Sequence, residues 1–160
     1  MPSIHCKGLK SVVLKIDLSK AYHRVSWTFL RVILSKMGFD VSFITWVMSS
    51  LTSVSFSVLI NGVTSSFFRS GYGLRQGCPL APLLFLVVEG LGRDLLSAKE
   101  CGAYRGICFG NNISLTHVLF VDDIVMITNG SAQSLSTLYE ILMDFSKASG
   151  MVINEDNSSF

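Results

Sequence analysis

Acidic residues are scarce in this sequence, and so are prolines and cysteines. Only 11 of the 160 residues are aspartate or glutamate and 15% are charged, whereas 49% are hydrophobic. An intrinsically disordered chain needs low hydrophobicity and high net charge, so this composition excludes that class. The net charge of +2 excludes a strongly basic tail and gives no electrostatic argument for nucleic acid. The length fits one domain, and we expect a single unit over residues 1–160.

Paired cysteines are missing as well. The sequence has no Cys-x-x-Cys pair, and its three histidines complete no zinc-binding spacing. We therefore expect neither a zinc ribbon nor a disulfide framework. We expect free thiols, buried or partly buried, at Cys6, Cys78, Cys101 and Cys108.

The sequence also lacks a long uninterrupted hydrophobic run. Residues 41–68 carry no charge, but serines and threonines recur through them and the turn signal Asn61-Gly62 interrupts them. The first residues contain lysines where a signal peptide would have an apolar core. We therefore expect no membrane span, no secretion, and a location in the nucleus or the cytoplasm.

Hydrophobic periodicity and capping residues predict the order of the elements. Helical spacing predicts four helices, which begin after Ser26, after Asp40, at Pro79 and after Ser131. Period-two patterns or short apolar runs predict strands over residues 11–18, 53–58, 63–69, 113–120 and 124–128, and a further strand that starts with residues 151–153. Paired strands between helices favour an α+β fold, in which helices pack on one face of an antiparallel sheet. We expect Trp27 and Trp46 to lie in the core and His117 to pack in the core or on the sheet.

Three of the few carboxylates occupy costly positions. Asp17 ends an apolar strand, and Asp122 and Asp123 lie at a turn between two apolar strands. If neighbouring strands bring them together, the like charges repel unless a cation compensates. A divalent metal ion would do so, because hard cations take oxygen ligands. The alternative is ordinary turn chemistry, since aspartate tolerates turn geometry well.

Four segments, in order, resemble the motifs of one family. Residues 14–22 (LKIDLSKAY) resemble motif A of reverse transcriptases, 73–85 (GLRQGCPLAPLLF) motif B, 120–123 (FVDD) motif C, and 149–154 (SGMVIN) the start of motif D. The combination is similar to non-LTR (LINE-type) retrotransposons. The resemblance implies a polymerase palm with an incomplete fingers region and no thumb. It also implies RNA-directed DNA polymerase chemistry with an RNA template, a DNA primer and dNTPs.

The resemblance assigns roles to particular residues. Asp17 and Asp122 would hold two Mg²⁺ ions, for which Mn²⁺ could substitute, with Asp123 assisting and the backbone carbonyl of Leu18 completing the metal shell. Tyr22 matches the steric-gate position, and its alternative is an ordinary packed aromatic ring. The remaining positions are expected to bind nucleotide, phosphate or template, or else to be plain loop residues: Arg75, Gln76 and Gly77.

The chain departs from the family pattern at several positions. His23 and Cys78 stand where the family usually has aspartate, Ala81 replaces a serine, Val121 replaces an alanine, and Asn157 occupies the candidate position of a lysine. Three hypotheses remain open: a polymerase core, a degenerate and inactive fragment, and a non-catalytic nucleic-acid-binding or scaffold domain. Fingers, thumb and endonuclease segments of a parent polyprotein are the expected partners. Whether Lys15, Lys20 and Arg24 face template or solvent stays open.

Overall fold

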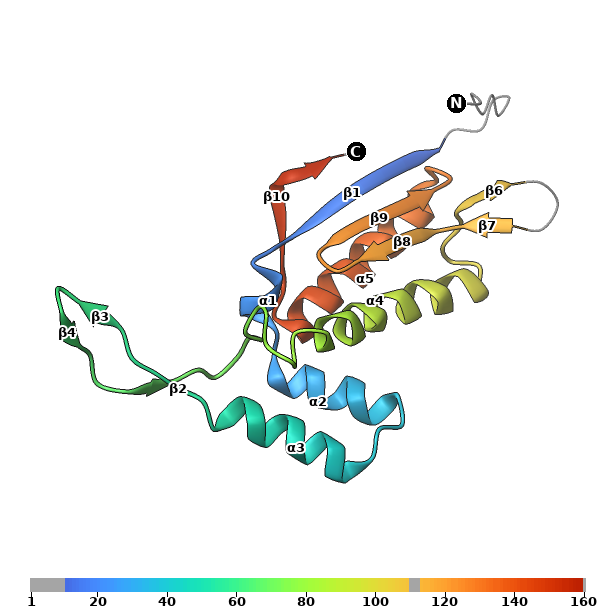
Figure 1. Cartoon of the computed structure of the whole chain (residues 1–160). Coiled ribbons are helices and arrows are strands. Elements are labelled where there is room, and N and C mark those ends of the chain that lie inside the picture. Colours follow the sequence, from blue (N-terminus) through green and yellow to red (C-terminus); the bar gives the residue numbers. More distant parts are fainter. Residues whose placement is uncertain (1–10, 110–112, 160) are drawn as a thin grey trace.

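A computed structural model describes residues 11–109 and 113–159, so His5 and Cys6 lie outside the described residues. Its centre is a four-stranded sheet in the order β10-β1-β9-β8, with every neighbouring pair antiparallel. The strands are β1 (Val12–Ser19), β8 (His117–Phe120), β9 (Asp123–Thr128) and β10 (Val152–Ser159). Strands from both ends of the chain thus lie side by side in this sheet (Figure 1).

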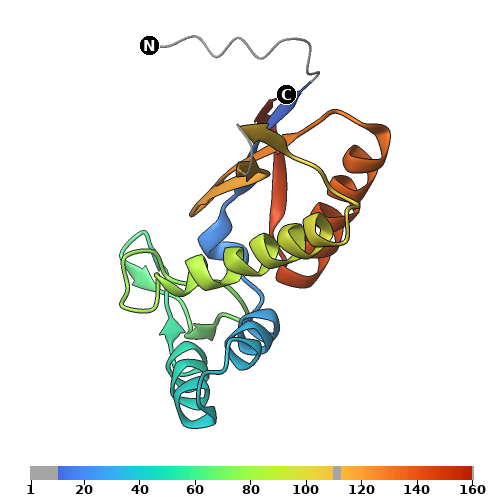
Figure 2. The same ribbon diagram turned by 90° about the vertical axis from the view of Figure 1, so that its right-hand side faces the viewer.

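Side-chain alternation gives the sheet one covered and one open face. Ile16, Ile124 and Met126 are almost fully buried on one face, as period-two patterning requires. On the other face Val118 and Phe120 remain 50% and 70% exposed. Helices α4 (Leu83–Glu100) and α5 (Ala132–Ser149) lie against the covered face (Figure 2). The expected α+β, palm-like architecture with helices on one face is confirmed.

Local capping explains where three helices begin. Helix α2 (Trp27–Lys36) starts after Ser26, α3 (Val41–Thr52) after Asp40, and α5 after Ser131; each capping side chain accepts a hydrogen bond from a backbone N–H of its helix's first turn. Helix α2 packs on α4, and α3 packs on α2. Between β1 and α2 lies the one-turn helix α1 (Ala21–Arg24). Among the described residues, no helix is long and apolar enough to cross a membrane.

The predicted hairpin around Asn61-Gly62 is present but divided into two short ladders. Strand β2 (Ser55–Phe56) pairs with β5 (Phe68–Arg69), and β3 (Leu59–Ile60) pairs with β4 (Val63–Thr64). Asn61 and Gly62 have φ of 50° and 83°, as a type I′ turn requires. We call residues 53–70 the arm, which projects away from the rest of the chain (Figure 1). Its apolar side chains are largely exposed, with Phe67 at 80%.

Several predicted boundaries were wrong. Helix α4 begins at Leu83, not at Pro79, because turns and a bend occupy residues 76–82 and Pro82 is the N-cap. The expected strand over 113–120 is broken at Thr116: β7 (Ile113–Leu115) pairs with the unforeseen β6 (Ile107–Phe109), and only β8 joins the main sheet. The last strand, predicted to start within residues 151–153, starts at Val152 and runs to Ser159.

Some burial predictions also need correction. Trp46 is 69% exposed, because α3 buries the face that carries Ile44 and Val47 instead. Trp27 is partly buried against the core, and its Nε1 donates to the Gly73 carbonyl at 2.8 Å. His117 lies half-buried on the helix-covered face, as expected. The described cysteines are free, but two are exposed and only one is partly buried: Cys101, Cys108 and Cys78.

Candidate functional site

The lone acid of β1 and the acidic doublet meet across the central strand pair. Asp17 lies directly opposite Asp123 in the register of β1 and β9. The Leu18 N–H donates to the Asp122 carbonyl oxygen at 3.3 Å, which places Asp122 at the same end of the strands. Residues directly opposite each other point to the same face of a sheet, and here it is the face away from the helices. The strand register therefore brings Asp17 opposite one residue of the acidic doublet, with the backbone of Asp122 at the same end of the strands.

The turn that carries the doublet is tight and strained. Phe120 pairs with Asp123, so only Val121 and Asp122 form the loop between β8 and β9. Val121 has a φ of 58°, a left-handed conformation that is costly for a β-branched residue. Such strain persists only where the surrounding structure enforces it. Here the side chain of Val121 packs against the hydrophobic core, and this contact holds the turn in place.

Protein groups already engage two of the carboxylates. Lys15 Nζ lies 3.2 Å from Asp123 Oδ1. Asp17 Oδ2 accepts hydrogen bonds from Asn154 Nδ2 at 2.9 Å and from Asn157 Nδ2 at 3.3 Å. Within the described ranges, no three acidic, histidine or cysteine side chains are grouped closely enough to hold a metal ion. A divalent cation would thus rely on Asp17, Asp122 and backbone oxygen, with the present partners adjusting.

The motif B loop is tied to the end of motif A by backbone hydrogen bonds. The Leu74 N–H donates to the Tyr22 carbonyl at 2.6 Å, and the Gly73 N–H donates to the Val25 carbonyl at 2.8 Å. Gly73 has a φ of +88°, and a Cβ there would lie 2.8 Å from the His23 carbonyl oxygen, so this close approach requires glycine. The loop therefore has a fixed position next to α1.

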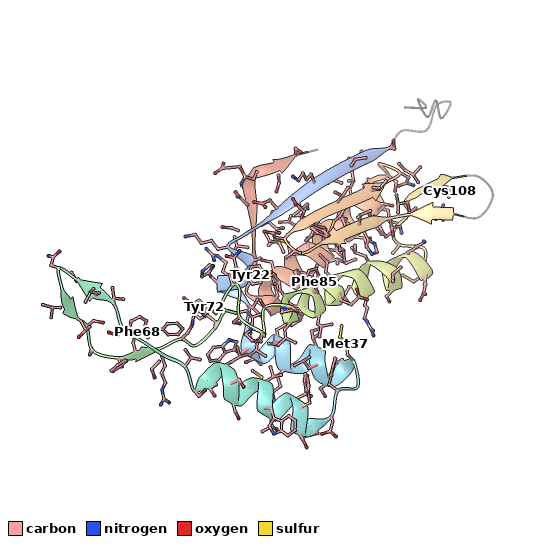
Figure 3. All side chains as sticks on the ribbon, viewed as in Figure 1. Tyr22, Met37, Phe68, Tyr72, Phe85 and Cys108 are labelled. Carbon is pink, nitrogen blue, oxygen red and sulfur yellow. The ribbon has the colours of Figure 1, made fainter. Side chains whose placement is uncertain are left out.

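The predicted nucleotide-binding residues differ in exposure. Tyr22 is partly buried and packs against the core, whereas the three loop residues that follow Leu74 are exposed: Arg75, Gln76 and Gly77. Figure 3 shows Tyr22 and Tyr72 where the arm rejoins the rest of the chain. Among the departures, His23 is exposed, Cys78 and Ala81 are partly buried, and Asn157 contacts Asp17.

An open pocket of about 570 Å³ lies beside this junction. Two cations and two aromatic rings line it, with no carboxylate among the lining residues: Lys20, His23, Arg24, Ser26, Trp27, Thr28, Gly71, Tyr72 and Gly150. The cations and Tyr72 are exposed. Such a surface suits a phosphate-bearing, stacking ligand better than a cationic one.

Sequence reasoning did not predict the two asparagine amides that donate hydrogen bonds to Asp17, which we call the clasp. Asn154 and Asn157 are 137 and 140 residues away from it in the chain, so no local pattern could have shown the contact. The one available signal was Asn157 itself, at the position where the family pattern has a lysine. The sequence did not decide whether Lys15 faces template or solvent, and in the structure Lys15 forms an ion pair with Asp123.

Comparison with known proteins gives consistent matches over nearly the whole chain. The family profile described as "Reverse transcriptase (RNA-dependent DNA polymerase)" matches residues 3–160. The Pol polyprotein of the type-2 retrotransposable element R2DM of Drosophila melanogaster is 30% identical over 145 residues, which are 90% of this chain and 13% of that polyprotein. That of the type-1 retrotransposable element R2 of Popillia japonica is 23% identical over 150 residues, or 94% of this chain and 24% of that polyprotein.

Solved structures share the fold at low sequence identity. Telomerase from Candida albicans, in complex with a fragment of telomeric RNA, superposes with a TM-score of 0.70 at 14% identity, over 94% of this chain and 26% of that one. Apo telomerase from Candida tropicalis gives a TM-score of 0.65 at 15% identity, over 94% and 28%. The chain therefore spans a quarter or less of the two polyproteins and just over a quarter of each telomerase.

Proposed function

Because this chain belongs to the reverse transcriptase family, in the non-LTR retrotransposon branch that its motifs resemble, we propose that it is the palm core of an RNA-directed DNA polymerase. The reaction is nucleotidyl transfer from a dNTP to the 3′-hydroxyl of a DNA primer on an RNA template, with release of pyrophosphate. The observation that carries this proposal is the register of Asp17 opposite Asp123 on the open face, with the backbone carbonyl of Asp122 bonded to the Leu18 N–H beside them.

The donor chemistry of this corner fits hard divalent cations. Asp17, Asp122 and the Leu18 carbonyl would hold two Mg²⁺ ions, or Mn²⁺ in their place, and Asp123 would assist. When bound, such ions neutralise phosphate charge and lower the pKa of the attacking hydroxyl. The open face of the sheet leaves room for the primer end. The tight turn at Val121 would hold Asp122 in place next to Asp17 without rearrangement during the reaction.

The incoming nucleotide would lie between α1 and the motif B loop. Tyr22 is the proposed steric gate, whose ring excludes a ribose 2′-hydroxyl, and its packing against the core supports a fixed ring. Gln76 and Gly77 would line the nucleotide pocket, and Arg75 would contact phosphate or template. The hydrogen bond between Leu74 and Tyr22 supports this arrangement, because it couples the position of the loop to that of the gate.

The distribution of charge along the chain supports nucleic-acid binding at the pocket. Residues 18–88 contain six lysines and arginines but one carboxylate, Asp40, whereas residues 89–160 contain four basic and nine acidic residues. The small net charge of +2 therefore combines a basic half, residues 18–88, with an acidic half, residues 89–160. The pocket lined by Lys20, Arg24 and Tyr72 lies in the basic half, where backbone phosphates and stacked bases would bind.

A second candidate is a folded but inactive nucleic-acid-binding fragment. Asn157 favours it, because an amide replaces the lysine expected in motif D and cannot supply a proton as an ammonium group can. In this case the carboxylates would still bind metal and the basic half would still bind nucleic acid, but turnover would be absent.

Primer extension by the full chain separates the two candidates. The assay uses an RNA template, a DNA primer, dNTPs and Mg²⁺ or Mn²⁺, and compares the parent with Asp17→Asn and Asp122→Asn. Losing about 4 kcal/mol of transition-state stabilisation would slow extension roughly a thousandfold in each variant. Asp40→Asn is the matched control, since asparagine also caps a helix well. Equal extension by Asp17→Asn and the parent would refute the assigned roles, and metal binding without extension would support the inactive fragment.

A further inference from the structure

The last strand does not follow a regular ladder where it passes Asp17. Asn154 lies opposite Asp17, but the next paired residue, Ser159, lies opposite Lys15. Between these two pairs β1 advances by two residues and β10 by five, whereas both strands advance equally in a regular ladder. The extra residues bulge out of the ladder at this edge of the sheet, next to the candidate catalytic corner. The bulge therefore brings the polar side chains of Asn157 and Ser158 next to Asp17.

The bulge holds Asp17 by both its side chain and its backbone. Asn154 Nδ2 and Asn157 Nδ2 donate to the same oxygen, Oδ2, at 2.9 and 3.3 Å. The Asp17 N–H donates to Ser158 Oγ at 3.3 Å, and Ser158 Oγ in turn donates to the Asn154 carbonyl at 2.6 Å. Asn154 is partly buried, whereas Asn157 is exposed. Asn154 makes the shorter and more sheltered contact.

On this geometry, and on the premise of the proposed function, we propose that Asn154 is a positioning residue for Asp17. Its amide fixes Oδ2 and so sets the rotamer of the carboxylate, leaving Oδ1 directed toward the site of the divalent cation. A neutral donor is suited to this task because it orients the carboxylate without cancelling the charge that attracts the cation. Asn157 is the second member of the clasp and donates to the same oxygen from a more exposed position.

Because neutral amides and not a cationic side chain contact Asp17, the effect of a substitution at residue 157 can be predicted. An ammonium group at that position would form an ion pair with Asp17 and would compete with a divalent cation for the same carboxylate. Asn157→Lys, which introduces the lysine of the family pattern, is therefore expected to weaken cation binding in this chain. That expectation distinguishes the clasp from a bulge that merely tolerates any polar residue.

The test measures Mn²⁺ binding to the full chain by electron paramagnetic resonance of the free ion, a readout that does not depend on turnover. Partners that orient a metal ligand typically contribute about 10- to 100-fold to affinity, and Asn154→Ala should weaken Mn²⁺ binding by that factor. Asn129→Ala is the matched control: Asn129 Oδ1 accepts a hydrogen bond from Ser131, and it lies beyond the other end of β9, roughly 20 Å from Asp17. This control should leave affinity unchanged.

The Asp17→Asn background separates this inference from the proposed function. If Asp17→Asn leaves Mn²⁺ binding intact, the proposed metal site itself is wrong. If Asp17→Asn weakens binding while Asn154→Ala does not, only the positioning role is overturned. An Asn154→Ala effect that is equally large in the Asp17→Asn background would also overturn it, since the residue must act through Asp17. Should Asn154→Ala unfold the chain, Asn157→Lys decides: weakened binding supports the clasp, and unchanged binding overturns it.

Discussion

The hydroxyl of Tyr104 binds the open end of the β8–β9 hairpin, whose turn carries Asp122. Removing this hydroxyl tests how the hairpin is held. The side chain is fully buried, and the single proton of its hydroxyl is shared between the Thr116 carbonyl at 2.8 Å and the Ile127 carbonyl at 3.0 Å. These two carbonyls lie at the start of β8 and near the end of β9. The hydroxyl therefore ties together the ends of the strands opposite the turn.

Tyr104→Phe keeps the ring and removes only the hydroxyl. The Thr116 carbonyl retains the Ile127 N–H at 2.8 Å, so the Ile127 carbonyl bears most of the loss. Leaving a buried acceptor without its donor costs about 1–3 kcal/mol, and we expect the free energy of unfolding to fall by that amount at pH 7. Urea denaturation monitored by circular dichroism measures it.

The same substitution should behave differently at high pH. Burial raises the pKa of Tyr104 from 10.0 to about 12, with the hydrogen bond to Ile127 opposing the shift. The stabilising effect of the neutral phenol is thus complete below pH 10 and is lost as the pH rises toward 12. Over this window the parent should lose about 2–3 kcal/mol that the phenylalanine variant does not lose. The reasoning fails if the stability difference at pH 7 is near zero, or if it does not shrink as the pH rises from 10 to 12.

Two further substitutions test the site's surroundings. Gly73→Ala should destabilise the chain by more than about 1 kcal/mol, because it forces a left-handed alanine against the His23 carbonyl; Gly71→Ala, which meets no neighbour, should be nearly neutral in the same urea titration. Lys20→Ala or Arg24→Ala should each reduce the slope of log affinity against log salt by about 0.7–0.9 for an RNA–DNA primer-template, whereas Arg105→Ala in the acidic half should not. An unchanged slope would place the nucleic acid elsewhere.

Local chemistry explains what the sequence could predict. Ser26, Asp40 and Ser131 begin their helices because each side chain satisfies an N–H in its own first turn, within three residues. Asn61-Gly62 specifies its turn by the same kind of local rule. Proline was less decisive: both Pro79 and Pro82 suit a helix start, and the turns between them settle the choice in favour of the second.

Non-local pairing explains what the sequence could not predict. The apolar run over 113–120 reads as one strand, but at Thr116 it changes partner from β6 to β9. Trp46 lies at a helical position that could face either way, and the packing of α3 on α2 decides which face is buried. The placement of Asp17 beside the strand turn that carries the acidic doublet could be inferred from the motifs, whereas the amides that hold Asp17 depend on a bulge near the other end of the chain.

Protein groups contact the carboxylates of Asp17 and Asp123, and this bears on whether the fold needs a metal ion to offset their negative charge. Like charges directly opposite each other on a sheet are destabilising, and the sequence suggested that a divalent cation relieves them. In the structure Lys15 pairs with Asp123, and two amides donate to Asp17, so protein groups already offset the repulsion. We therefore expect the circular dichroism spectrum and the cooperative unfolding transition to persist in EDTA.

Added Mn²⁺ should then act only by mass action on a preformed corner. At a free concentration 100 times the dissociation constant, one site raises the free energy of unfolding by about 2.7 kcal/mol. Asp122→Asn should abolish this increment without changing the stability measured in EDTA by a comparable amount. Unfolding of the parent on chelation would contradict the argument, because it would mean that the cation, and not Lys15 and the asparagines, holds the two strands together against their charge.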